Sequence, residues 1–139
     1  MSEETQQERG TPETLRARSL AAGLTVDDIE ASVAWYRDVV GFVLEEEWKQ
    51  DGKLVGAAML AGTVRLFLGQ DDWAKGRDRS KGAGVRLHLT TAQSVDDIAA
   101  RIKSHGGALE SEPADMPWGV RAFSVVDPTG YNLTISSEA

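Results

Sequence analysis

The chain has 139 residues, enough for one domain with a buried core, and its content of hydrophobic (41%) and charged (27%) residues is typical of soluble globular proteins. It lacks cysteine, which excludes disulfides, thiolate nucleophiles and cysteine-ligated metals. The net charge of −7 argues against a nucleic-acid partner and is compatible with a basic ligand. Because no run of about 18 apolar residues and no basic-then-apolar leader occurs, we expect a cytoplasmic protein that does not enter a membrane.

The N-terminal segment at residues 1–17 is polar and charged, and Gly10 and Pro12 interrupt it. Such a segment buries too little apolar surface to offset the entropy cost of ordering, so we expect a flexible tail. The remaining chain, residues 18–137, is expected to form a single domain.

The first half of this domain has the pattern of a strand, a helix and three more strands. Apolar residues alternate over residues 19–26, which predicts a strand. Asp27 and Glu30 have the spacing of a capping box, and Gly41 suits the left-handed end of a helix. The apolar stripe of that helix consists of Ile29, Val33, Tyr36 and Val40. Three strands are predicted after it, at residues 42–48, 54–60 and 64–68.

A charged, glycine-containing connector at residues 70–83 follows, and then the pattern starts again. Alternation over residues 85–89 predicts a strand, and Ser94 with Asp97 predicts a second helix start. Further strands are expected at residues 108–112, 121–126 and 131–136. Asp27 and Ser94 lie 67 positions apart, and Gly62 and Gly130 lie 68 apart. The sequence therefore predicts an α+β fold of two tandem βαβββ modules, at residues 18–69 and 84–137.

Two stretches carry a resemblance to a known family. Residues 26–42 end in Trp35-Tyr36-Arg37-Asp38-Val39-Val40-Gly41-Phe42, and residues 117–133 contain Trp118-Gly119 and Asp127-Pro128-Thr129-Gly130. Over about residues 18–137 the chain resembles the vicinal-oxygen-chelate superfamily, also called the glyoxalase/bleomycin-resistance/dioxygenase group. The resemblance implies an open, U-shaped mixed sheet around a central cleft, with helices on the outer face. It does not imply one function, since this fold hosts isomerases, lyases, dioxygenases and binding proteins.

The resemblance also indicates where a metal would be held. In the metalloenzymes of this family, each module supplies one ligand from its first strand and one from its last. The corresponding positions here are Ala21, Phe67, either Arg86 or His88, and Thr134. Methyl, phenyl, hydroxyl and guanidinium groups are not ligands for a divalent cation, which leaves at most His88. We therefore predict no metal site and no cofactor.

The predicted cleft keeps side chains that suit a small planar ligand, because aromatic faces stack and thioethers adapt their shape. The candidate ligand-binding residues are Trp48, Met59, Phe67, Arg86, His88, Trp118 and Thr134. Three of them also have a structural interpretation: His88 as a hydrogen-bonded structural residue, Arg86 as a member of an ion pair, and Trp118 as a packing residue.

Three functions follow as hypotheses. The first is a metal-free protein that binds and sequesters an aromatic or antibiotic-like small molecule. The second is a lyase or isomerase in which His88 is the general base and Arg86 stabilises an oxyanion, or in which the metal site is misaligned. The third is an interaction domain whose hollow is filled by side chains such as Phe67. A homodimer is expected in each case, because open sheet edges favour pairing with another chain.

Overall fold

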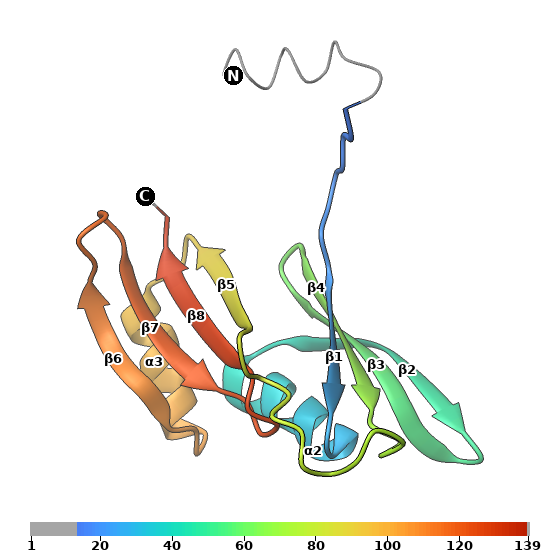
Figure 1. Cartoon of the computed structure of the whole chain (residues 1–139). Helices are drawn as coiled ribbons and strands as arrows, with labels where there is room; N and C mark the ends of the chain where they lie inside the picture. Colours follow the sequence, from blue (N-terminus) through green and yellow to red (C-terminus); the bar gives the residue numbers. More distant parts are fainter. Residues whose placement is uncertain (1–13, 139) are drawn as a thin grey trace.

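The computed structural model describes residues 14–138, and the part of the predicted tail at residues 1–13 lies outside the described residues. Residues 14–21 form neither helix nor strand and lead away from the domain (Figure 1). The rest of the chain forms two βαβββ modules, which confirms the predicted α+β fold.

The first module is built on one four-stranded mixed sheet. Its elements in chain order are β1 (Ala22–Val26), α2 (Ile29–Ala34), the π-helix η1 (Trp35–Val40), β2 (Val43–Gln50), β3 (Lys53–Ala61) and β4 (Val64–Gln70). The strand order is β1-β4-β3-β2, and β1 runs parallel to β4 whereas the other pairs are antiparallel.

The second module repeats this topology. Its elements are β5 (Arg86–Thr91), α3 (Val95–Ser104), β6 (Leu109–Asp115), β7 (Arg121–Val126) and β8 (Asn132–Ser137). The order is β5-β8-β7-β6, with β5 parallel to β8. The two sheets lie side by side with β1 and β5 as neighbouring edges, and they remain two separate hydrogen-bonded sheets (Figure 1).

The first helix begins one residue later than its capping-box pattern predicts. Asp28, not Asp27, is the N-cap, and its carboxylate accepts a hydrogen bond from the Ala31 amide at 3.2 Å. The carboxylate of Asp27 instead forms an ion pair with Lys81, a partner 54 residues away that local spacing does not reveal. In the second module Ser94 caps α3 as predicted, because its hydroxyl accepts from the Asp97 amide.

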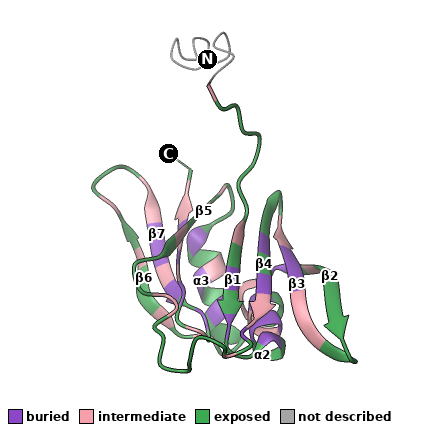
Figure 2. Ribbon diagram, turned by 45° about the vertical axis from the view of Figure 1, so that its right-hand side comes forward, coloured by how far each residue is buried: buried purple, intermediate pink, exposed green. Residues whose placement is uncertain are grey.

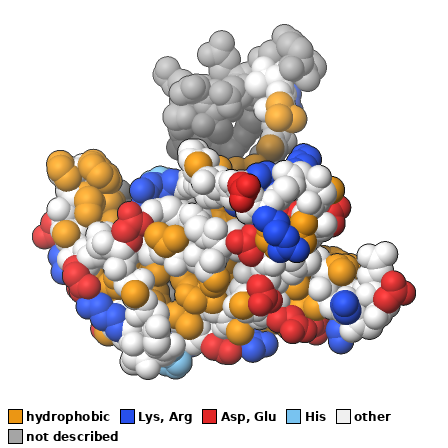
Figure 3. Space-filling model, turned by 60° about the horizontal axis from the view of Figure 1, so that its bottom comes forward, with side chains coloured by type: hydrophobic (Ala, Val, Ile, Leu, Met, Phe, Trp, Pro, Cys, Tyr) orange, Lys and Arg blue, Asp and Glu red, His pale blue; other side chains and the backbone are white. Residues whose placement is uncertain are grey.

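Both modules share one hydrophobic core, which the purple segments of the strands and helices mark in Figure 2. Each sheet turns one set of alternating side chains toward this core, such as Leu66 and Leu68 of β4 or Leu133 and Ile135 of β8. We call the other side of each sheet its open face. On the surface drawn in Figure 3, acidic and basic side chains are interspersed around apolar patches.

A buried hydrogen bond joins the two stretches that resemble the superfamily. Tyr36, on η1, donates from its hydroxyl to Asp127 Oδ2 at 2.7 Å, and Asp127 Oδ1 accepts from the amides of Thr129, Gly130 and Tyr131 at 2.9 Å each. Burial, followed by the negative charge of Asp127, raises the pKa of Tyr36 well above its usual range. The two motifs therefore serve to hold one module against the other.

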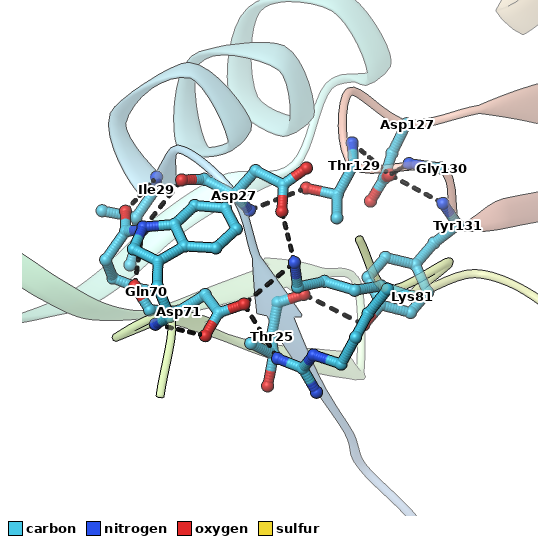
Figure 4. Close-up of polar contacts among 12 residues, drawn as sticks. Thr25, Asp27, Ile29, Gln70, Asp71, Lys81, Asp127, Thr129, Gly130 and Tyr131 are labelled. Carbon is cyan, nitrogen blue, oxygen red and sulfur yellow. Dashed lines mark hydrogen bonds and ion pairs between the residues drawn. The ribbon is translucent and has the colours of Figure 1, made fainter. Parts of the chain in front are cut away.

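A buried lysine holds the connector against the first module (Figure 4). The Lys81 side chain is only 4% exposed and contacts the carboxylates of Asp27 and Asp71. Asp71 also accepts hydrogen bonds from Arg79 and from the Trp73 amide, both at 2.8 Å. The hydrogen bond from Lys81 is the largest of the effects that lower the pKa of Asp71 to about 2. This segment is therefore a fixed part of the domain.

Candidate functional site

The structure separates the seven predicted ligand-binding residues into four places. Trp48 and Phe67 lie together on the open face of the first sheet, with ring centroids 6.3 Å apart. Arg86, His88 and Thr134 lie on the open face of the second sheet, where β5 pairs with β8 and His88 stands opposite Thr134.

The other two predicted residues lie elsewhere. Met59 is 0% exposed and belongs to the shared core, on the helix side of β3 opposite Leu44 and Leu66. It is therefore not available to a ligand on the open face. Trp118 is 72% exposed, in the turn between β6 and β7.

Arg86 is the centre of a polar network on the open face of the second sheet. Its Nη1 donates to Asn132 Oδ1 at 2.6 Å, to Thr134 Oγ1 at 2.8 Å and to Ser124 Oγ at 3.3 Å. The hydroxyls of Ser124 and Thr134 lie 3.0 Å apart. Strand register explains this grouping, since Ser124 and Thr134 are directly paired, as are Arg86 and Asn132. The network fixes the position of the guanidinium group.

A cavity of about 420 Å³ lies between the neighbouring edges of the two sheets. Arg86 and His88 line it from β5, and Ala21 lines it from the segment before β1. The remaining lining residues are mostly apolar: Leu20, Ala22, Phe42, Val64, Arg65, Leu66, Leu87, Leu89 and Leu133. This volume and composition are typical of small-molecule sites.

A second cavity of about 690 Å³ adjoins the first, because Phe42, Val64 and Leu89 line both. Sequence reasoning missed Phe42 and Arg65 as lining residues. Their role depends on how the two modules pack against each other, and no local pattern in the sequence reports that packing.

The residues at the four family metal positions do not fit a divalent cation. Ala21 and Phe67 have no donor atom, and Thr134 already shares its hydroxyl with Arg86 and Ser124. The remaining position is occupied either by Arg86, a cation, or by His88, which would be a single ligand. Among residues 14–138, no three His, Asp or Glu side chains come together in a way that could hold a metal ion. His88 lies on the open face of β5, and its side chain has no hydrogen-bond partner within this part of the chain.

Comparison with known proteins identifies the family. The model of the glyoxalase/bleomycin resistance protein/dioxygenase superfamily matches residues 18–135. The chain belongs to this superfamily. A search of curated proteins finds no match to the chain.

Several solved structures resemble the chain at low identity. TioX from Micromonospora sp. ML1 is 21% identical, covers 88% of this chain and 97% of its own, and has a TM-score of 0.69. TnmS3, described as an antibiotic binding protein from Streptomyces sp. CB03234, is 24% identical with coverages of 89% and 98% and a TM-score of 0.68. A superfamily member from Sphaerobacter thermophilus DSM 20745 is 23% identical, with coverages of 88% and 98% and a TM-score of 0.70. At these identities the likeness concerns the fold.

Membership places this chain in a superfamily whose fold is shared by enzymes and binding proteins, so its function has to be argued from its own residues. Within the described residues, no helix has the length and apolar character needed to cross a bilayer.

Proposed function

We propose that this protein is a metal-free member of the glyoxalase/bleomycin resistance protein/dioxygenase superfamily that binds a small aromatic or antibiotic-like molecule. The observation that carries the proposal is the 420 Å³ cavity, in which mostly apolar side chains surround Arg86 and His88. The description of the similar TnmS3 as an antibiotic binding protein supports this class of ligand.

The aromatic pair of Trp48 and Phe67 offers a second ligand-binding surface on the open face of the first sheet. Both rings are partly exposed, and Trp48 packs across Gly56, where the absence of a side chain leaves room for the indole. A planar ligand could stack here, since aromatic faces pair favourably. Neither cavity described above is lined by these two rings.

We further propose that the protein forms a homodimer in the cytoplasm. β1 pairs only with β4 and β5 only with β8, so the outer edge of each strand has no strand partner within the described residues. Leu20, next to β1, is 97% exposed, and Val43 at the start of β2 is 64% exposed. Unpaired edges and exposed apolar side chains favour association with a second copy.

Fluorescence titration tests the binding proposal. The four tryptophans report on the protein, and Trp48→Phe identifies the share of the signal that comes from the aromatic pair. Saturable quenching by planar aromatic compounds is expected, together with less than stoichiometric divalent metal in the purified protein. One tightly bound divalent ion per chain would contradict the proposal. Turnover of a bound compound that is lost in His88→Ala would favour the lyase or isomerase hypothesis instead.

A further inference from the structure

Two arginines line the cavity between the modules, although the protein is acidic overall. Arg65, Arg86 and His88 contribute to its wall, and among the described residues that line it there is no Asp or Glu. The whole chain carries a net charge of −7, which is compatible with a basic ligand. The ionisable side chains that line the cavity indicate instead a preference for an anionic ligand.

Arg86 is held in place without being neutralised. Within residues 14–138 it forms no ion pair, whereas Arg65 is paired with Glu45 at 3.0 Å. The nearest acidic group in the network is Glu110, which accepts a hydrogen bond from the Asn132 side-chain amide and so reaches Arg86 only through that amide. Arg86, one of the residues that line the cavity, therefore retains a full positive charge.

The hydrogen bonds of Arg86 leave part of its guanidinium group free. All three of its bonds to described residues use Nη1, so the N–H groups on Nε and Nη2 remain available. These two nitrogens form the planar fork that binds a carboxylate or similar oxyanion through two parallel hydrogen bonds. Because Ser124, Asn132 and Thr134 already fix the group, binding an anion would cost little additional side-chain entropy.

The rest of the wall is suited to an apolar body. Leu20, Leu87 and Leu89 line the same cavity as Arg86 and keep exposed surface, and the volume of about 420 Å³ suits a small molecule. We infer that the cavity binds an amphipathic molecule with a carboxylate or another anionic oxygen group, the anion on Arg86 and the apolar part against these leucines. This inference rests on the proposed binding function and adds the charge of the ligand to it.

A matched pair of probes tests the charge preference. Naphthalene-2-carboxylate and naphthalene-2-carboxamide have the same shape and differ in charge, and calorimetry measures the affinity of each. We expect the carboxylate to bind at least about tenfold more tightly, as for a charge-assisted hydrogen-bonded pair. Arg86→Gln should remove this difference, and Arg86→Lys should retain only part of it because an ammonium group lacks the planar fork. Arg37→Gln, at an exposed arginine paired with Asp38, should keep it in full.

The two histidines of the chain show where the probe binds. His88 lines the cavity, whereas His105 follows α3 and bonds through Nδ1 with the Arg101 carbonyl. In proton NMR spectra, the imidazole signals of His88 should shift on addition of the carboxylate, and those of His105 should stay in place. A shift of His105 alone would place the probe outside the cavity and overturn the inference.

The remaining outcomes separate this inference from the proposed function. Equal affinity for carboxylate and amide at the His88 site would overturn the charge preference and leave small-molecule binding intact. A preference for the carboxylate that survives in Arg86→Gln would overturn the role of Arg86. Failure of both probes to bind at millimolar concentration would overturn the proposed binding function as well.

Discussion

The Tyr36–Asp127 hydrogen bond offers a direct measure of how strongly the two modules are held together. Tyr36→Phe removes the hydroxyl that donates to Asp127 Oδ2 at 2.7 Å and leaves the ring packed against Trp35 and Phe42. Asp127 is only 4% exposed, so Oδ2 cannot gain a full substitute from water. A hydrogen bond to a charged group contributes about 1.5–3 kcal/mol to the free energy of unfolding. In a domain of this size that loss lowers Tm by about 5–15 °C.

The matched control is Tyr131→Phe. Its hydroxyl donates to a neutral acceptor, the Thr25 carbonyl, at 2.9 Å, and a bond of this kind contributes about 0.5–1.5 kcal/mol. Urea denaturation at neutral pH measures both variants on one scale. If Tyr36→Phe lowers the free energy of unfolding by less than about 0.5 kcal/mol, or by no more than Tyr131→Phe does, Tyr36 does not form a buried hydrogen bond to a charged acceptor.

The dependence of the free energy of unfolding on pH above neutrality provides a second measure of the same hydrogen bond. The pKa of Tyr36 is raised in the folded protein because burial and Asp127 disfavour the phenolate, whereas the unfolded tyrosine titrates near about 10. Above that pH the unfolded state binds fewer protons than the folded state, so the free energy of unfolding falls as pH rises. Tyr36→Phe should show a shallower fall between about pH 10 and 12. If the free energy of unfolding falls equally steeply in the variant and the original protein, the raised pKa of Tyr36 is not the cause of the fall.

Three further predictions concern the connector and the assembly. A Cβ at Gly82 would lie 1.9 Å from the Gly130 carbonyl oxygen, so Gly82→Ala should destabilise the protein by about 1–3 kcal/mol in chemical denaturation. Gly23→Ala, with open space around its Cβ, should leave stability nearly unchanged, and equal effects would contradict the close approach. Because the pKa of Asp71 is lowered to about 2, Asp71 contributes stability above its unfolded pKa that is lost as pH falls from about 4 toward 2. Asp71→Asn should therefore show a weaker decline of the denaturation midpoint over that range, and an unchanged decline would show that another carboxyl is responsible. Light scattering coupled to size exclusion should give a mass near 30 kDa, twice the 15.0 kDa of one chain, and a mass near 15 kDa at micromolar concentration would exclude the dimer.

Much of the fold could be predicted because it depends on local patterns. Alternation, helical spacing and the recurrence of landmarks near 67 positions identified both modules, and Ser94 caps α3 as its spacing indicates. The capping-box pattern predicted the wrong N-cap, Asp27, because two adjacent aspartates both suit that position. Lys81, distant in sequence, binds one of them, and the other caps the helix.

The site could be predicted only in part, because alternation assigns faces only where polar and apolar residues alternate. On β5 they do, and Arg86 and His88 lie on the open face together. On β3 they do not: Ala57, Ala58 and Met59 are all buried, so the sequence contained no signal that Met59 faces the helices. The bulges of β2 further hide the register that brings Trp48 near Phe67.

The sequence by itself determined the repeated βαβββ topology, because this depends on which residue types occur at which spacing. It also showed that at most one of the four positions indicated by the family resemblance, the one occupied by Arg86 or His88, holds a possible metal donor. The tertiary structure alone decided the rest. It buried Met59, separated the aromatic pair from Arg86, and joined Tyr36 to Asp127 and Lys81 to Asp27. It also placed two arginines and His88 around one cavity of an acidic protein. These contacts join residues far apart in the chain, and their geometry depends on how two packed modules meet.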